Sequence, residues 1–396
     1  LAVDRWALLT AALWLLHPIN VTSVLYTVQR MNSLSALFVL AAMAVYVHGR
    51  LRMIERGGAL WPAALGTLGL GALGFLCKQN AALLPAYLLL IDWLFLGFRT
   101  RNGRGRRELI VFFSIVAFIP FLVGLAYLIS DWERVTRGYA RRTFSLEERM
   151  LTQPRALWFY LKNLILPDYG ALGLYHDGFR LSESLLRPRS TLAAILGLMA
   201  LTVGAFLTRH RAPVAAFGIL FFLAGHSIES GFIALEPLFE HRNYLPGVGI
   251  LAALAYGIIW AFQRLRLHVL RAALVSALIA LLAGTTGLRA YDWRSQEAFT
   301  LAQVAKHPNS PRANFQAGQL LITRLPESRD PAETYALARH YLERVVELKE
   351  ENADGLFGLI VLNLYAGRPP EPVWIEELKQ RLRTYPYSAE NVTTSQ

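Results

Sequence analysis

Charged residues are scarce in this chain, since Asp, Glu, Lys and Arg make up 17% of its 396 residues, whereas soluble domains contain about 25%. Acidic residues are fewer than basic ones, 28 against 40, and the formal net charge is +12. The basic residues are mostly arginines that lie in short loops between apolar runs. This distribution is typical of membrane orientation, and it does not favour nucleic-acid binding.

Cysteine is almost absent as well. Cys77 is the one cysteine, which excludes an intrachain disulfide and a cysteine metal cluster. The chain also contains no glycine-rich phosphate loop, no nucleophile elbow and no HExxH motif, so three common catalytic classes have no support. His226 and Glu229 are three residues apart, but no third ligand pattern accompanies them. We therefore expect no divalent metal and assign no certain cofactor.

Long apolar runs are what the chain does contain. Hydrophobic residues make up 54% of it, and the mean hydropathy is +0.35. A helix needs about 20 residues to cross a bilayer, and several runs approach or reach that length. We predict an all-α fold in which residues 1–290 form a polytopic bundle of eight to nine transmembrane helices. The predicted helices are 6–16, 34–47, 60–76, 81–98, 109–130, 191–208, 212–227, 245–262 and 269–288.

Arginine-rich loops predict the orientation of this bundle, because cytoplasmic loops have an excess of Arg and Lys. Four such loops alternate with the remaining ones: 49–58, 99–107, 208–211 and 263–271. If all four are cytoplasmic, the loop 131–190 and everything after Arg289 lie outside. The composition, rich in Arg, Ala, Leu and Gly, suggests a bacterial source. We therefore expect an inner-membrane protein with its C-terminal part in the periplasm.

Two segments outside the apolar runs have helical periodicity. Within the outer loop, residues 154–166 alternate apolar and polar positions around Trp158. This pattern fits a helix in the outer membrane interface, or a loop helix that packs on the bundle. After residue 291 the chain changes to amphipathic helices, 295–306, 311–323, 331–349, 353–365 and 371–384. Their pairing and the small residues at Gly318 and Gly358 predict a tetratricopeptide-like domain over 291–396.

Three polar clusters fall on the predicted outer face. They occupy residues 17–30, 78–80 and 229–246. Ionisable side chains between membrane spans are costly and are functional candidates by default. The candidates for binding a phosphate are Lys78, Arg30 and Arg242, and the candidates for lining a cleft are His17, His226, Glu229, Glu236, Glu240 and His241.

Structural alternatives exist for several of these residues. Arg30 stands at a span end, where an arginine also anchors a helix by extending to the interface. Lys78 could cap the carbonyls of the preceding helix. Glu240 could pair with Arg242 or Arg30. Asp92 lies inside a predicted span, far from the outer clusters, so we expect it to be paired and to fix helix registry.

Several short motifs occur in an order that is similar to one family. They are His17-Pro18 with Arg30, Cys77-Lys78-Gln79-Asn80 with Asp92, Glu240 through Tyr244-Leu245-Pro246, and Trp293 followed by His307-Pro308-Asn309 and helical repeats. This order resembles the transmembrane and tetratricopeptide-repeat proteins, a protein O-mannosyltransferase-like group of the GT-C glycosyltransferase superfamily. Thr22, Asn32 and Gln79 stand where the family has acidic residues.

The resemblance implies a membrane glycosyltransferase with a GT-C-like fold and a polyprenyl-phosphate sugar as its donor. It implies an acceptor polypeptide held by the repeats, and membrane lipid as the surroundings. In that family the catalytic acid precedes the His-Pro motif, so we expect it upstream of Leu1 and assign no catalytic residue. Two alternatives remain: an oligosaccharide ligase or polymerase of the same membrane, and a membrane-anchored repeat scaffold without activity.

Overall fold

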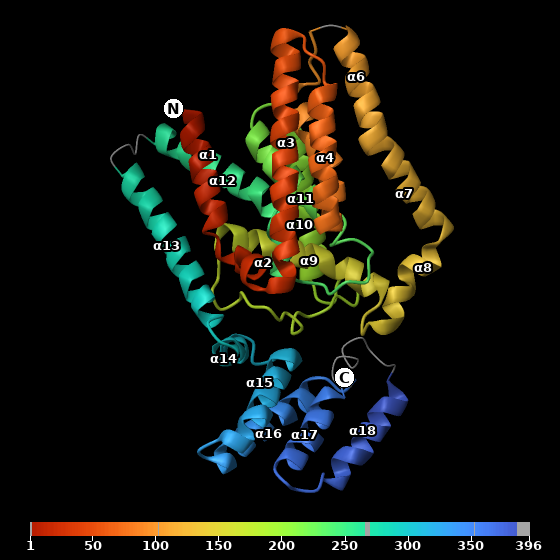
Figure 1. Cartoon of the computed structure of the whole chain (residues 1–396), viewed down its shortest axis with the longest axis vertical. Coiled ribbons are helices and arrows are strands. Elements are labelled where there is room, and N and C mark those ends of the chain that lie inside the picture. The colour runs from red at the N-terminus through yellow and green to blue at the C-terminus, as the bar shows by residue number, and fades with distance from the viewer. Residues whose placement is uncertain (1, 102, 266–269, 352, 386–396) are drawn as a thin grey trace. The chain divides into compact units, whose positions relative to one another are not determined.

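The computed structural model describes residues 2–101, 103–265, 270–351 and 353–385. Helices dominate these residues, where the one extended pairing is an isolated bridge between Ser184 and Arg187 (Figure 1). The chain divides into two compact units. The first contains Leu1–Arg137, Arg149–Pro167 and Ser182–Gly287, and the second contains Gly138–Glu148, Asp168–Leu181 and Leu288–Gln396. Two segments of the predicted outer loop 131–190 therefore belong to the second unit.

The helices of the first unit follow most of the predicted apolar runs. Its α-helices are α1 (Ala2–Leu15), α2 (Val21–Leu25), α3 (Arg30–Arg56), α4 (Trp61–Cys77), α5 (Leu84–Ile91), α6 (Gly103–Phe113), α7 (Ile119–Ser130), α8 (Trp132–Thr136), α9 (Leu146–Ile165), α10 (Ser190–Thr208), α11 (Pro213–His226), α12 (Pro246–Arg264) and α13 (Arg271–Asp292). Short 3-10 helices are η1 (Pro18–Asn20), η2 (Thr27–Gln29), η3 (Gln79–Leu83) and η7 (Glu240–Asn243), and π-helical segments are η4 (Asp92–Leu96) and η5 (Ser114–Phe118).

Six helices in the described part of the chain are long and apolar enough to cross a membrane. They are Thr27–Arg56, Gln79–Leu96, Gly103–Ser130, Ser190–Thr208, Pro246–Arg264 and Arg271–Asp292. A seventh is counted if Asp4–Leu15 and Pro18–Leu25, which meet at 53°, form one bent span. The apolar helices α4 and α11 are shorter, with 17 and 14 residues. The predicted eight to nine spans thus correspond to six or seven helices of spanning length and two short ones, consistent with an integral membrane protein.

Arg50 and Asp92 form a fully buried ion pair in the interior of the first unit. A guanidinium nitrogen of Arg50 lies 2.8 Å from Asp92 Oδ1, both side chains are fully buried, and the Tyr46 hydroxyl also donates to Asp92. The prediction that Asp92 is paired is therefore confirmed. The prediction that residues 49–58 form a loop is wrong at its start, because α3 continues to Arg56. Asp92 compensates the charge of Arg50, so the helix can bury that arginine.

Helix α9 forms where the outer loop showed helical periodicity, but it begins earlier than predicted, at Leu146. Leu161 and Leu164 are buried, so this face packs on protein. Trp158 is 37% exposed, and its indole Nε1 donates to the Ala194 carbonyl at 3.0 Å. The packed alternative therefore describes one face of this helix.

The second unit contains η6 (Arg137–Arg141), η8 (Leu325–Glu327) and the helices α14 (Gln296–Lys306), α15 (Pro311–Arg324), α16 (Pro331–Leu348), α17 (Asp354–Tyr365) and α18 (Pro372–Thr384). The five predicted C-terminal helices match these bounds to within a residue. Leu342 lies at the centre of their core, and a methyl group added to Gly318 or Gly358 would come within 2.6 or 2.4 Å of it. Small residues were thus predicted correctly as points of close helix packing.

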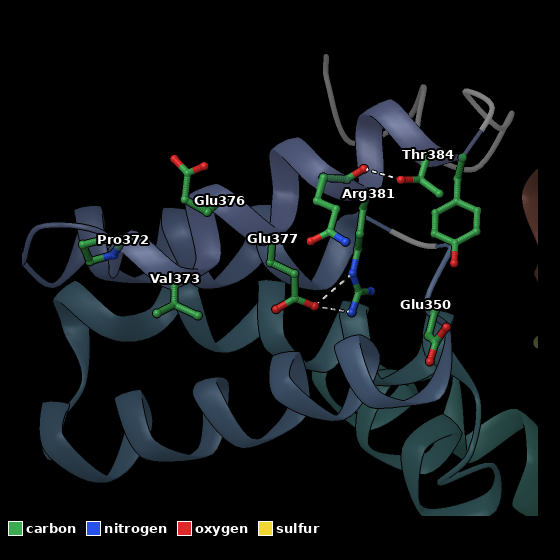
Figure 2. A pocket seen from close by; sticks show the side chains of 9 residues that line it. Glu350, Pro372, Val373, Glu376, Glu377, Arg381 and Thr384 are labelled. Atoms are coloured by element: carbon green, nitrogen blue, oxygen red, sulfur yellow. Dashed lines mark hydrogen bonds and ion pairs between the residues drawn. The ribbon is translucent and has the colours of Figure 1, made fainter.

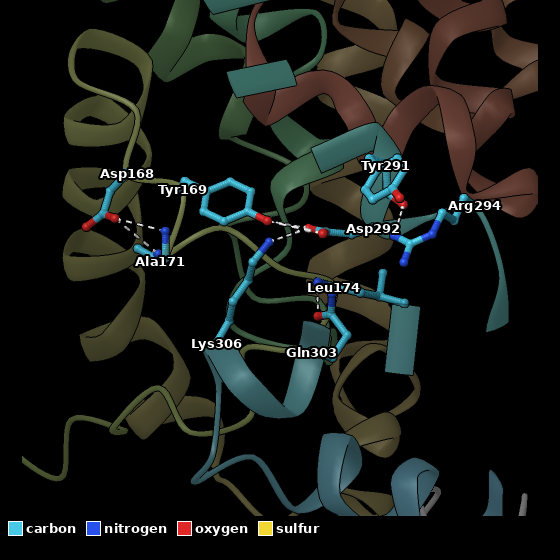
Figure 3. A network of polar contacts seen from close by, with 10 residues as sticks. Asp168, Tyr169, Ala171, Leu174, Tyr291, Asp292, Arg294, Gln303 and Lys306 are labelled. Carbon is cyan, nitrogen blue, oxygen red and sulfur yellow. Dashed lines mark hydrogen bonds and ion pairs between the residues drawn. The ribbon is translucent and has the colours of Figure 1, made fainter. Parts of the chain in front are cut away.

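Segment 168–181 packs against the helices of the second unit (Figure 3). The Tyr169 hydroxyl donates to the Asp292 carboxylate at 2.9 Å, and Lys306 Nζ forms an ion pair with that carboxylate at 2.6 Å. The Leu174 amide donates to Gln303 Oε1 at 2.8 Å. These contacts tie a distant loop segment to the beginning of the helical array.

Candidate functional site

Three stretches that the sequence singles out meet in the first unit. Helix η7, which contains Glu240 to Asn243, contacts both η1 and α2 of the His17–Arg30 region. Lys78 follows α4 directly, because an extended backbone at this residue ends the helix before η3 begins. The ammonium of Lys78 reaches the 229–246 stretch. We refer to Lys78, Glu229 and Arg242 with Asn32 and Asn80 as the charge cluster.

Lys78 is the centre of the charge cluster. Its Nζ lies 2.6 Å from Glu229 Oε1 and donates to Asn32 Oδ1 at 2.5 Å. Lys78 is 8% exposed and Glu229 is 7% exposed, so solvent screens this ion pair little. Burial lowers the pKa of Lys78, the neighbouring Arg242 lowers it further, and Glu229 acts in the opposite direction. Desolvation is thus the main cause of the lowered pKa, and the Glu229 carboxylate offsets part of it.

Glu229 remains ionised in this environment. Burial by itself would raise the pKa of its carboxyl, but the charges of Lys78 and Arg242 and the hydrogen bonds from Lys78 and Asn80 lower that pKa to about 2. Glu229 Oε2 has no hydrogen-bond partner although it is buried. Two cations thus share one carboxylate whose second oxygen is unused.

Arg242 is the second cation of the charge cluster. It is 4% exposed, and its guanidinium lies over the Phe239 ring at 5.3 Å and donates to the Pro237 carbonyl at 3.3 Å. A further hydrogen bond joins it to Tyr160 of α9. Its Nε is buried without a partner. An oriented guanidinium with an unused donor is suited to an anionic oxygen.

Two histidines border the charge cluster. The His241 ring stacks on Phe239 at 5.1 Å; burial, together with the positive charges of Lys78 and Arg242, lowers its pKa to about 3. This imidazole is therefore neutral near pH 7, and its Nδ1 is buried without a partner. His226 stacks on Tyr160 at 5.2 Å, and its Nε2 lies 3.2 Å from Asn243 Oδ1.

The other candidates lie around the charge cluster in different ways. His17 is buried as the cap of η1, where its Nδ1 accepts from the Ile19 amide and its Nε2 lies 3.1 Å from the Leu164 carbonyl oxygen. Glu240 is buried in η7, and Glu236 is half-buried in the loop before it. Arg30 is exposed, and its Nε donates to the Val24 carbonyl at 3.0 Å. The geometry thus groups Lys78 with Glu229, Arg242 and His241, and it gives Arg30 a different local role.

Several residues of the site were not singled out as candidates. Asn32 and Asn80 belong to motifs that contain Arg30 and Lys78, and their amide side chains were the available signal. Arg149 of α9 gave no such signal. It is fully buried and donates to the carbonyls of Glu229, Gly231 and Leu235. It therefore holds the loop on which Glu229 lies.

A groove in the second unit has a different character (Figure 2). It has a volume of about 730 Å³ and is lined by exposed side chains of α18 together with Glu350. Glu377 and Arg381 form an ion pair across it at 2.5 Å. Its lining contains none of the candidate residues, and surface charges that pair with one another leave no unused group for a ligand. Within the described residues, no three His, Cys, Asp or Glu side chains are placed to hold a metal ion.

Comparison of the chain with protein-family profiles, with curated protein sequences and with solved structures found no match.

Proposed function

We propose that this protein is a membrane glycosyltransferase that binds a polyprenyl-phosphate sugar with its phosphate at the charge cluster. The observation that carries the proposal is the burial of Lys78 and Arg242 beside the Glu229 carboxylate, with Glu229 Oε2 and Arg242 Nε both left without a hydrogen-bond partner. A buried charge without full compensation is strongly unfavourable. A ligand of the opposite charge would compensate such a buried charge when it binds.

The charge of the cluster favours one kind of donor. Two cations and one carboxylate leave one positive charge, which a phosphodiester with one negative charge would neutralise. A diphosphate-linked donor would bring an additional negative charge into a buried site, and the excess would have no partner in the cluster. The polyprenyl chain would lie among the apolar helices of the first unit. The cluster therefore supports a polyprenyl-phosphate donor over a diphosphate-linked one.

The chemical step follows from this placement. The acceptor hydroxyl oxygen forms a bond to the anomeric carbon of the sugar, and the bond between that carbon and the phosphate oxygen breaks. The phosphate leaves with the bonding electron pair, and Lys78 and Arg242 stabilise the negative charge that develops on it. The acceptor proton passes to a carboxylate acting as a general base. No residue of this chain is assigned to that carboxylate.

The acceptor in this proposal is a polypeptide bound by the second unit. A groove of about 410 Å³ lies along α14, α15 and α17. Gln296, Gln316 and Gln319 line it together with Phe357 and Tyr365. Neutral amides and aromatic rings can pair with the backbone of an extended peptide while contacting its side chains. The proposed arrangement is tetratricopeptide-like, in the periplasm of a bacterial inner membrane.

A binding experiment tests the donor site. The purified full chain in detergent is titrated with a polyprenyl-phosphate sugar, which is a phosphodiester, and with the corresponding diphosphate-linked sugar, and each complex is quantified by native mass spectrometry. Lys78→Met and Arg242→Met should each lower polyprenyl-phosphate affinity by about tenfold or more, because each removes a charge-assisted contact of roughly 1.5–3 kcal/mol. Arg30→Met, at an exposed arginine outside the cluster, is the matched control and should bind as the native chain does.

A double variant distinguishes a loss of lipid binding from a loss of folding. Lys78→Met combined with Glu229→Gln removes both charges of the ion pair and leaves Arg242 as the one charge of the cluster, so this variant also shows whether the fold tolerates that buried guanidinium. It should elute as the native chain does on size exclusion and still bind the polyprenyl-phosphate sugar poorly. Native affinity in both Lys78→Met and Arg242→Met would refute the donor site. Preference for the diphosphate would favour the ligase or polymerase alternative, and no binding of either lipid would favour a scaffold.

A further inference from the structure

An apolar groove in the first unit is lined by residues of α1, α12 and α13. Figure 1 shows the course of these three helices. The volume of the groove is about 290 Å³, and its walls are largely aliphatic, with Leu8, Leu9, Ile259, Val275 and Ile279 among the lining residues. Its volume and aliphatic lining suit one hydrocarbon chain. Helix α13 also exposes Leu274 and Leu281, so this side of the unit is apolar beyond the groove itself.

One end of this groove is polar and positively charged. Arg5 is in the first turns of α1, Gln263 is in the last turn of α12, and Arg271 is the first residue of α13. All three line the groove. Neither arginine forms an ion pair with any residue in the described part of the chain. The exposed Arg5 and the half-buried Arg271 therefore stand at the mouth of an aliphatic groove, and neither has a carboxylate partner among the described residues.

We propose that this groove binds an anionic phospholipid, with one acyl chain against the aliphatic wall and its phosphate between Arg5 and Arg271. Guanidinium groups bind phosphate oxygens in a bidentate manner, and basic pockets between membrane helices bind anionic headgroups. The Gln263 amide adds a neutral donor at the same place. The positive charge of the two arginines then favours a lipid with an anionic headgroup over a lipid with a zwitterionic one.

This lipid site is separate from the proposed donor site. Arg5 precedes His17 by twelve residues, most of them in α1, which places the two ends roughly 18 Å apart at 1.5 Å per residue. The far end of α1 is fixed to the η7 region, where Trp14 Nε1 donates to the Tyr244 carbonyl at 2.7 Å. The inference therefore does not depend on the proposed function.

The bound lipid would fasten α13 to the rest of the unit. At the end of α13 that is distant from Arg271, the Thr286 hydroxyl donates to the Leu16 carbonyl at 2.7 Å. At the Arg271 end, the groove separates α13 from α1 and α12. An acyl chain would fill this gap, and its phosphate would link the first turns of α1 and α13.

Native mass spectrometry of the full chain in detergent tests this proposal with phosphatidylglycerol, phosphatidylcholine and inorganic phosphate as separate probes. The native chain should retain one phosphatidylglycerol in preference to phosphatidylcholine. Arg5→Gln and Arg271→Gln should each lower phosphatidylglycerol affinity by about fivefold, the effect of one arginine near an anionic headgroup. Arg264→Gln is the matched control, because it ends α12 in an exposed position and does not line the groove.

A third substitution separates a lipid from a free phosphate. Ala12→Trp places an indole in the aliphatic part of the groove and should abolish lipid retention while leaving both arginines in place. Inorganic phosphate should not displace the lipid at equal concentration, since it lacks the acyl chain. The proposal is wrong if the two arginine variants retain the lipid as the native chain does, if Arg264→Gln loses it equally, or if phosphate alone displaces it.

Discussion

At the scale of single residues, the charge cluster depends on which groups are ionised. Glu229 is a carboxylate at any pH above about 2, and His241 is a neutral imidazole at any pH above about 3. Burial lowers the pKa of His241 and raises that of Glu229, and the positive charges of Lys78 and Arg242 lower both pKa values. Near neutral pH the imidazole therefore offers a neutral ring beside the cluster and adds no third cation.

The free energy of unfolding should decrease as the pH is lowered, because of His241. Its pKa is about 3 in the folded chain and 6.5 as the ordinary value, so below pH 6.5 the unfolded chain binds a proton that the folded chain does not. The contribution is complete above pH 6.5 and is lost as pH falls toward 3, at up to about 1.4 kcal/mol per pH unit. Unfolding in detergent at pH 7 and at pH 5 measures it.

His241→Gln should remove this part of the pH dependence. His48→Gln, at an exposed histidine of α3, is the control and should leave the native slope unchanged. Glu229 adds a loss of the same sign between pH 4.5 and about 2, which begins below the range compared. An identical slope in the native chain and in His241→Gln would contradict the assignment of a neutral buried imidazole.

The Arg50 and Asp92 pair should matter for stability and not for ligand binding. Asp92→Leu leaves a fully buried guanidinium unpaired and should cost about 3–5 kcal/mol. Arg50→Met combined with Asp92→Leu removes both charges and should recover most of that loss. Thermal unfolding in detergent measures both variants, and equal destabilisation in the single and double variants would show that the pair itself is not the cause.

At the scale of elements, the helices were predictable where local signals and burial agree. Helix α15 begins at Pro311 after Ser310, whose hydroxyl accepts from the Ala313 amide, and the sequence shows both signals. The extent of α3 was not predictable, because Arg50 alone is typical of a loop and its partner Asp92 is 42 residues away. The ion pair of Lys78 with Glu229 was not predictable for the same reason, because these two residues are also far apart in the chain; the pairing expected from the sequence was that of Glu240 with Arg242 or Arg30.

Helix α9 should control the order of the loop that contains Glu229. Arg149 Nη2 donates to the Glu229 carbonyl at 2.6 Å and Nε donates to Gly231 at 3.1 Å, while Gln153 donates to Pro237 at 3.1 Å. Arg149→Met removes the charged donor from these carbonyls, each such bond contributing roughly 1.5–3 kcal/mol. Hydrogen exchange of residues 229–239 should then accelerate by tenfold or more.

Arg155→Met is the matched substitution on the same helix. Arg155 donates to Ser182 at 3.2 Å, away from the 229–239 loop, so exchange in that loop should remain near the native rate. Equal hydrogen-exchange rates for residues 229–239 in Arg149→Met and Arg155→Met would contradict the role assigned to Arg149. Polyprenyl-phosphate affinity should fall with the loss of order, because Glu229 positions Lys78.

At the scale of the whole molecule, the second unit is assembled from three separate stretches of the chain. Asp177 joins two of them: its carboxylate accepts from the Ser310 hydroxyl at 2.5 Å and from the Arg312 amide at 2.9 Å. The 168–181 segment therefore holds the helices at the beginning of the C-terminal array. A cut in the connection before α14 should leave the C-terminal fragment bound.

A protease site inserted between Arg294 and Ser295 tests this retention. After cleavage in detergent, the fragment should co-elute with the remaining chain on size exclusion, because Asp177 and Gln303 still connect it to the 168–181 segment. Asp177→Ala should release a larger share of the fragment. Glu376→Ala, at an exposed residue of α18, is the control, and release of the fragment from the otherwise native chain would contradict the expectation.

The second unit can form only after all three of its chain segments have been synthesised. Asp177 leaves the ribosome well before Ser310, since the two residues are 133 positions apart. At about 5–20 residues per second of synthesis, the 168–181 segment waits on the order of 10 s for α14 and α15. During that interval the whole of α10 to α13 is made. Completion of this unit therefore follows the synthesis of α10 to α13.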